Sequence, residues 1–232
     1  MGKSNTFENE WLDHVLRNAT IPNIGDATGL RGSTAAGNVY LALHTADPGE
    51  AGDQTTSEAT YTSYARTALS RDTAGTPAFG AAASGAASNA ILIQCPQCTG
   101  GSNNISHWSI GVASGGASKI LYRGCIGGTP IAFTGKASDD IVRIPGHTFV
   151  VDDRIVFAAD PSGGLPTGIT EGTIYWVKTV SGNDITLSTT QGGATLDLTA
   201  DGSGMVAEVT ILAVSNLIRP EFAIGQLVCR ET

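Results

Sequence analysis

The sequence predicts a mainly β protein: a β-sandwich or barrel with one N-terminal α-helix and an inserted small β module. Apolar residues come in short runs of strand length, separated by Gly, Asn, Ser and Thr. The 30 glycines suit a chain with many tight turns, because glycine adopts the positive φ angles that such turns require. Hydrophobic residues make up 41% of the chain, enough to form a folded core.

The one convincing helical pattern lies near the start of the chain. Its apolar residues share one face of a helix, and these are Phe7, Trp11, Leu12, Val15, Leu16 and Ala19. Asn5 followed by Glu8 resembles a capping box that would begin the helix, and Pro22 would end it.

Two uses of this helical face stay open. It can pack on the chain's own sheet, or it can dock onto a neighbouring subunit. The hypothesis for the second use names four candidate intersubunit contact residues, Phe7, Trp11, Leu12 and Leu16, together with the C-terminal strand that ends near Cys229.

Short apolar runs predict the strands of the first part of the chain. These runs are residues 39–45, 60–69, 90–93, 105–112 and 119–124, with a shorter strand near 78–79. The runs at 105–112 and 119–124 are expected to pair as a hairpin. Strong turn chemistry at 45–50 and a polar acidic loop at 51–59 follow the first strand.

The pattern of apolar runs and turns changes in the second half of the sequence. Strand-like runs at 148–151, 154–157, 172–177 and 184–188 are separated by Gly-rich turns, and Ser181-Gly182-Asn183-Asp184 predicts a hairpin turn. An alternating strand pattern returns at 226–230. The sequence therefore predicts a β-sandwich or barrel core with the helix, formed by 1–135 and 211–232, and an inserted β module at 136–210.

The charge of the chain disfavours a nucleic-acid partner. The formal net charge is −8, and the four lysines are scattered: Lys3, Lys119, Lys136 and Lys178. A phosphate-binding surface needs clustered basic residues. We expect no membrane partner either, since no run is long or apolar enough to cross a bilayer and no signal peptide is evident.

The sequence contains no pattern that predicts catalysis, a cofactor or a metal. Paired carboxylates occur at Asp139-Asp140 and Asp152-Asp153, but neighbours in a strand point to opposite faces and in a turn they meet water. A polysaccharide depolymerase is the enzyme alternative. The cysteines, at positions 95, 98, 125 and 229, allow a zinc site or a redox pair, but small buried apolar residues are the favoured interpretation.

Several segments carry a family resemblance. Leu41–Glu50, Thr60–Arg66, Ser106–Gly111, Ile120–Gly124 and Val214–Val228 occur in an order that resembles small bacteriophage virion structural proteins labelled "tail fibre protein". The resemblance covers about residues 1–134 and 212–232. In that family the hairpin passes directly to the closing strands, whereas here an insertion intervenes that is similar to a small β module found in phage fibre and appendage proteins.

The resemblance implies a non-enzymatic virion structural protein, assembled in the host cytoplasm. Within that class, the sequence favours a capsid decoration (cement) protein on the outer surface of the head, because a compact acidic β domain with a terminal helix suits that role. The alternative is a tail fibre or tail appendage component involved in host attachment. The expected partners are the major capsid protein or other virion subunits, with assembly into a homo-oligomer such as a trimer.

Overall fold

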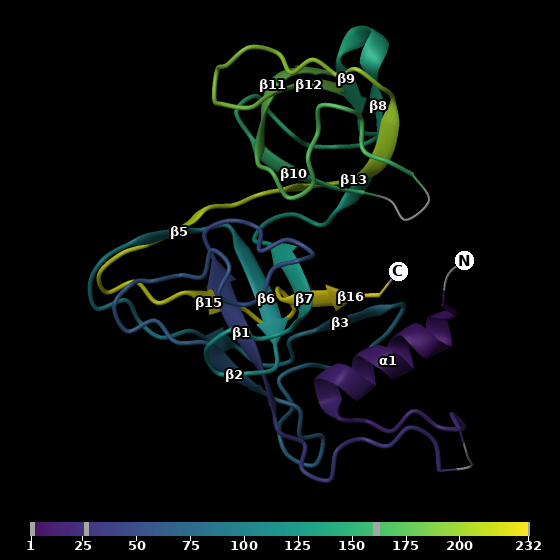
Figure 1. Ribbon diagram of the computed structural model, residues 1–232, viewed down its shortest axis with the longest axis vertical. Helices are drawn as coiled ribbons and strands as arrows, with labels where there is room; N and C mark the ends of the chain where they lie inside the picture. Colours follow the sequence, from purple (N-terminus) through teal and green to yellow (C-terminus); the bar gives the residue numbers. More distant parts are fainter. Residues whose placement is uncertain (1–2, 26–27, 160–162, 232) are drawn as a thin grey trace. The chain divides into compact units, whose positions relative to one another are not determined.

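The computed structural model describes residues 3–25, 28–159 and 163–231 and confirms the mainly β fold class. The chain forms two compact units (Figure 1), which are Met1–Arg123 with Ala213–Thr232, and Gly124–Leu212. The first unit carries the helix, one four-stranded sheet and several two-stranded ribbons, and the second contains a closed six-stranded barrel.

Helix α1 (Asn5–Arg17) begins one residue away from the predicted cap and ends well before Pro22. Its N-cap is Ser4 rather than Asn5, because the Ser4 hydroxyl accepts a hydrogen bond from the backbone N–H of Phe7 at 3.3 Å. The helix ends where Asn18 adopts a left-handed conformation with φ of 57°, so Pro22 does not end it. No helix in the described part of the chain is long and apolar enough to span a membrane.

The four-stranded sheet contains the strands that the sequence predicted best. Its order is β2 (Thr67–Ser70), β1 (Asn38–His44), β6 (His107–Gly111) and β7 (Ile120–Cys125). Strand β1 is antiparallel to both β2 and β6, and the β6–β7 hairpin is confirmed. The strand predicted over 60–69 is wrong in its first part, since only the segment from Thr67 pairs as a strand.

Three short ribbons tie the end of the chain to its first half. β16 (Val228–Arg230) pairs with β3 (Ala86–Ser88), β15 (Glu221–Phe222) pairs with β4 (Ile93–Gln94), and β14 (Leu212–Val214) pairs with β5 (Asn103–Ile105). The strand predicted at 90–93 is therefore displaced, and the one at 226–230 is shorter than expected. The short strand predicted near 78–79 is reduced to one isolated bridge, between Phe79 and Asn89.

The barrel contains the strands β8 (Ile131–Lys136), β9 (Ile141–Arg143), β10 (Arg154–Ala159), β11 (Tyr175–Ser181), β12 (Asp184–Ser188) and β13 (Gly202–Glu208), and the 3-10 helix η1 (Ala137–Asp139). The strands close in the order β10-β11-β12-β9-β8-β13. Closure leaves no unpaired edge, which removes a site for unwanted strand pairing. The first barrel strand, β8, begins at Ile131, whereas the sequence predicted that the inserted module starts at residue 136.

Alternating side chains fill the barrel interior, as the strand period of two requires. Phe133, Phe157 and Tyr175 make edge-to-face contacts there, with ring centroids 4.9 and 5.8 Å apart. The hairpin predicted at 181–184 is confirmed, and Gly182 takes the positive φ of 62° that its turn needs. The strand predicted at 148–151 is wrong: Val150 and Val151 are exposed in a turn where Asp152 has φ of 75°.

The two ends of the barrel module lie against each other within the second unit. The backbone N–H of Thr210 donates to the carbonyl of Ile126 at 2.6 Å, and Gly127 and Val209 form an isolated antiparallel bridge. The chain therefore enters and leaves this module through one short ladder of backbone hydrogen bonds.

Candidate functional site

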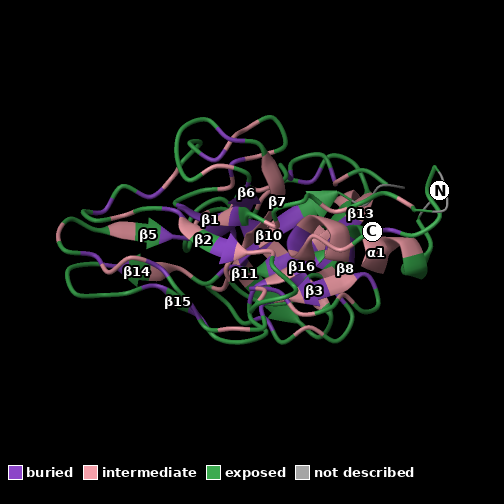
Figure 2. Ribbon diagram, turned by 90° about the horizontal axis from the view of Figure 1, so that it is seen from below, coloured by how far each residue is buried: buried purple, intermediate pink, exposed green. Residues whose placement is uncertain are grey.

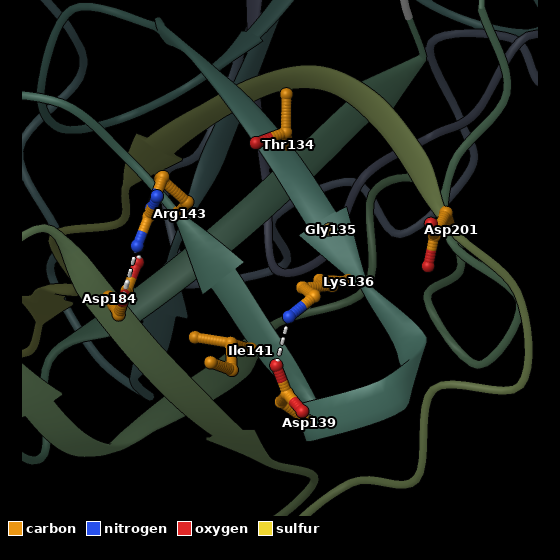
Figure 3. Close-up of a pocket in the computed structure, with 8 residues that line it drawn as sticks. All are labelled: Thr134, Gly135, Lys136, Asp139, Ile141, Arg143, Asp184 and Asp201. Carbon is orange, nitrogen blue, oxygen red and sulfur yellow. Dashed lines mark hydrogen bonds and ion pairs between the residues drawn. The ribbon is translucent and has the colours of Figure 1, made fainter.

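The barrel carries a hollow of about 460 Å³ on its surface (Figure 3), a size within the range of small-molecule sites. Eight residues line it: Thr134, Gly135, Lys136, Asp139, Ile141, Arg143, Asp184 and Asp201. They come from β8, β9, β12, the 3-10 helix and the residue before β13. All of them belong to the second unit.

Strand periodicity places this hollow on the outer wall of the barrel. Phe133, Val142 and Ile185 are buried in the core, and their neighbours along each strand point the other way. Arg143 is the residue paired across the ladder with both Thr134 on β8 and Asp184 on β12. The pocket floor is therefore held by the regular part of the barrel rather than by loops.

Two ion pairs set the electrostatics of the pocket. Arg143 donates from Nε and Nη2 to the two carboxylate oxygens of Asp184, at 2.7 and 2.8 Å. Lys136 pairs with Asp139 three residues later. These hydrogen bonds from the cationic side chains lower the pKa values of Asp184 and Asp139.

The third carboxylate of the pocket has a backbone partner. Asp201 accepts the N–H of Ala137, the first residue of the 3-10 helix, at 2.8 Å. General acid catalysis needs a carboxyl group whose pKa is raised, and in Asp139 and Asp184 it is lowered. The arrangement therefore offers hydrogen-bond donors and acceptors for binding and holds neither of these two groups protonated.

Among the carboxylates that the sequence singled out, Asp140 and Asp152 are turn residues with positive φ. Asp140 has φ of 55° and accepts the backbone N–H of Leu198 at 2.8 Å. Asp153 accepts the N–H of Val150 at 2.7 Å. Asp139 lines the pocket, but its neighbour Asp140 serves the fold instead.

The structure divides the four candidate intersubunit residues into two kinds. Leu12 and Leu16 are fully buried in the chain's own core and have no surface to offer a partner. Trp11 is 36% exposed and Phe7 is half-buried, with their ring centroids 6.5 Å apart. Figure 2 shows the mixed burial of α1. Of the four candidates, only Phe7 and Trp11 keep an accessible surface, and their contact with a neighbouring subunit stays a hypothesis.

A buried polar cluster in the first unit was not predicted. Arg66, whose side chain is 2% exposed, forms a two-point ion pair with Glu58. The same guanidinium donates to Gln54 at 3.2 Å and to the carbonyls of Ala113 and Gly116 at 3.1 and 2.8 Å. Every one of these contacts is internal, so the cluster is a structural feature.

Two histidines extend the buried polar region. His44 contacts the carbonyl of Thr56 at 2.8 Å and the hydroxyl of Ser109 at 2.7 Å. Burial lowers the pKa of His44, and it lowers that of His107 to about 4. Both side chains are buried and contact only groups of the first unit in these hydrogen bonds, so they contribute to its interior.

The cysteines form no disulfide, and three of the four are buried. Burial raises the pKa of the Cys95 thiol to about 11, which keeps it protonated and unreactive. Among residues 3–25, 28–159 and 163–231, no group of three or more His, Cys, Asp and Glu side chains is placed to hold a metal ion.

Residues 2–129 match the model of a family described as "Podophage GP4 fiber I protein gp80". The chain belongs to this podophage fibre protein family. The match covers more than half of the sequence, and it confirms the resemblance to phage proteins of the fibre type. No curated protein matches the chain.

Membership of the gp80 family makes the chain a phage structural protein of fibre type and a virion component. This family is not a known enzyme family. The match ends at residue 129, ahead of every residue that lines the barrel pocket. The pocket is thus carried by the part of the chain that the family match does not include.

Proposed function

We propose that the protein is a tail-fibre or tail-appendage component that takes part in attachment of the phage to its host. The observation that carries the proposal is the match of residues 2–129 to a podophage fibre family. The sequence favoured capsid decoration, but a fibre family supports the alternative better than it supports a cement protein.

The architecture is consistent with an attachment role. A cement protein needs surfaces that hold the shell, whereas an attachment protein also needs a surface that meets the host. The second unit is a closed barrel with a polar hollow and accessible charged side chains. Polar groups placed in such a hollow can fix the orientation of a bound ligand and provide specificity.

The proposed partners are other virion structural subunits, with assembly into a homo-oligomer such as a trimer. The aromatic pair of α1, half-buried Phe7 and exposed Trp11, is the proposed contact. Aromatic residues are enriched at protein interfaces because they bury a large area at a low entropy cost.

Gold labelling of purified particles with antibodies against the protein tests the proposal. We expect label at the tail in a few copies per particle, and we expect the same antibodies to slow adsorption to host cells. Label spread over the head at high copy number would overturn the proposal and support capsid decoration. Incubation of the protein with host polysaccharide, followed by size analysis, tests the depolymerase alternative, for which the polysaccharide would shorten.

A further inference from the structure

We propose that the hollow on the outer wall of the barrel binds a neutral saccharide of the bacterial surface. This proposal rests on the proposed attachment function and names the ligand class of one site. The site is formed by Thr134, Lys136, Asp139, Ile141, Arg143 and Asp184 (Figure 3).

The pocket presents hydrogen-bond donors and acceptors side by side. Arg143 uses Nε and Nη2 for Asp184, which leaves the N–H groups of Nη1 for a ligand. Each oxygen of Asp184 has a second lone pair beyond the one that Arg143 occupies. A sugar hydroxyl both donates and accepts, so adjacent hydroxyls can bind such a cation–carboxylate pair at two points.

The ion pairs favour a neutral ligand over a charged one. The pocket holds two cationic side chains and three carboxylates, and both cations already have a carboxylate partner. An anionic ligand would have to displace a carboxylate from a cation, and a cationic ligand would have to do the reverse. A neutral polyhydroxy ligand adds hydrogen bonds and leaves both pairs intact.

The pocket is accessible and preorganised. The side chains of Lys136 and Arg143 are 63% and 64% exposed, so a polymer in solution can reach them. Ile141 is partly exposed and offers an apolar contact for the C–H face of a sugar ring. Paired strands fix the spacing of these groups, which reduces the entropy lost on binding.

Binding to an array of bacterial surface polysaccharides tests the assignment. The array carries both lipopolysaccharide O-chains and capsular polysaccharides from cells that the phage infects, with heparin as a polyanionic probe. We expect the intact chain to bind at least one neutral polysaccharide. The variants Arg143→Ala and Lys136→Ala should each weaken that binding at least tenfold.

Arg154→Ala is the matched control. Arg154 lies on β10 of the same barrel, where its guanidinium stacks 4.5 Å from the centre of the Trp176 ring, and it does not line the pocket. We expect this variant to bind as the unchanged chain does. Far-UV circular dichroism checks that all three variants are folded.

Three results would overturn the saccharide assignment: no binding to any polysaccharide, binding to heparin alone, or equal binding by the Arg143, Lys136 and Arg154 variants. The outcome is separable from that of the particle labelling. Label at the tail with no saccharide binding rejects the ligand only. Label on the head, with saccharide binding lost in Arg143→Ala, rejects the attachment function and keeps the site.

Discussion

Glu58 binds Arg66 through both of its carboxylate oxygens, with Arg66 Nε 2.7 Å from Oε1 and Nη2 2.9 Å from Oε2. The pair lies eight residues apart along the chain and forms beneath the surface of the first unit. From there the guanidinium also holds the carbonyls of Ala113 and Gly116, so one side chain connects three separate segments.

Replacing Glu58 with Gln should destabilise the first unit by about 3–5 kcal/mol, because the Arg66 charge would then lie buried without its counter-ion. Urea denaturation followed by tryptophan fluorescence measures this loss. Arg17→Met is the control, since Arg17 forms a partly exposed pair with Asp13 on α1 and its loss should cost less than about 1 kcal/mol. Equal losses in the two variants would contradict the prediction.

Acid should weaken the fold through His107. Burial lowers its pKa from an ordinary value of 6.5 to about 4, so the unfolded chain takes up a proton at a pH where the folded chain does not. With respect to His107, the free energy of unfolding is therefore highest above pH 7. It decreases by on the order of 3 kcal/mol as the pH falls from about 6.5 to about 4. Urea denaturation at a series of pH values measures the slope.

His107→Asn separates this effect from general acid sensitivity. The variant should be less stable at pH 8, because the buried contact of His107 with the hydroxyl of Ser106 is changed. Its stability should nevertheless fall less steeply between pH 6.5 and 4. An unchanged slope would assign the acid response to other groups.

Gly135→Ala should disrupt the barrel. A Cβ atom at this position would lie 2.3 Å from Cγ of Pro166, too close for any carbon contact. We expect a loss of about 1–3 kcal/mol from this overpacking, measured by thermal unfolding. Gly128→Ala is the control, because its new Cβ would lie at an ordinary 3.5 Å from Glu208 Cβ, and we expect a change within about 0.5 kcal/mol.

Trp11→Ala should reduce incorporation into particles more than it reduces stability, because the Trp11 side chain is 36% exposed. Leu12→Ala should do the opposite and lower stability by about 2–5 kcal/mol, since Leu12 is fully buried. Quantitative mass spectrometry of purified particles and thermal unfolding give the two readouts. Parallel losses in both readouts for Trp11→Ala would place this residue in the internal core.

Thiol labelling of the folded protein should be selective for Cys125, which is only partly buried. The other three thiols are buried, and burial raises the pKa of both Cys95 and Cys229. We expect about one thiol per chain to react with Ellman's reagent under native conditions and all four in denaturant. Rapid reaction of several thiols in the folded state would contradict this assignment.

The elements that the sequence predicted correctly are those whose signal is local. The helix follows from apolar spacing, and β1, β6 and β7 follow from continuous apolar runs. The strand predicted over 60–69 does not form in its first part, because this segment makes tertiary contacts instead. The hydroxyl of Tyr64 donates to Glu58 and accepts the N–H of Leu43. The periodicity of the sequence does not reveal tertiary contacts that replace strand pairing.

The barrel pocket could not be predicted, because its residues are brought together by strand order. Lys136 and Asp139 are close in sequence, but Arg143 and Asp184 are 41 residues apart and meet only when β9 pairs with β12. The burial of Arg66 could not be predicted from the sequence either. A charged residue is expected at the surface unless its partners are known.

The bridge between Gly127 and Val209, and the hydrogen bond from Thr210 to Ile126, have a genetic consequence. The polypeptide between these positions begins and ends at one point in the structure, and one continuous gene segment encodes it. Such a cassette can be exchanged for another whose two ends also meet, with no change to the codons on either side. Recombination at this joint would replace the whole barrel in one event while the rest of the fibre protein stays the same.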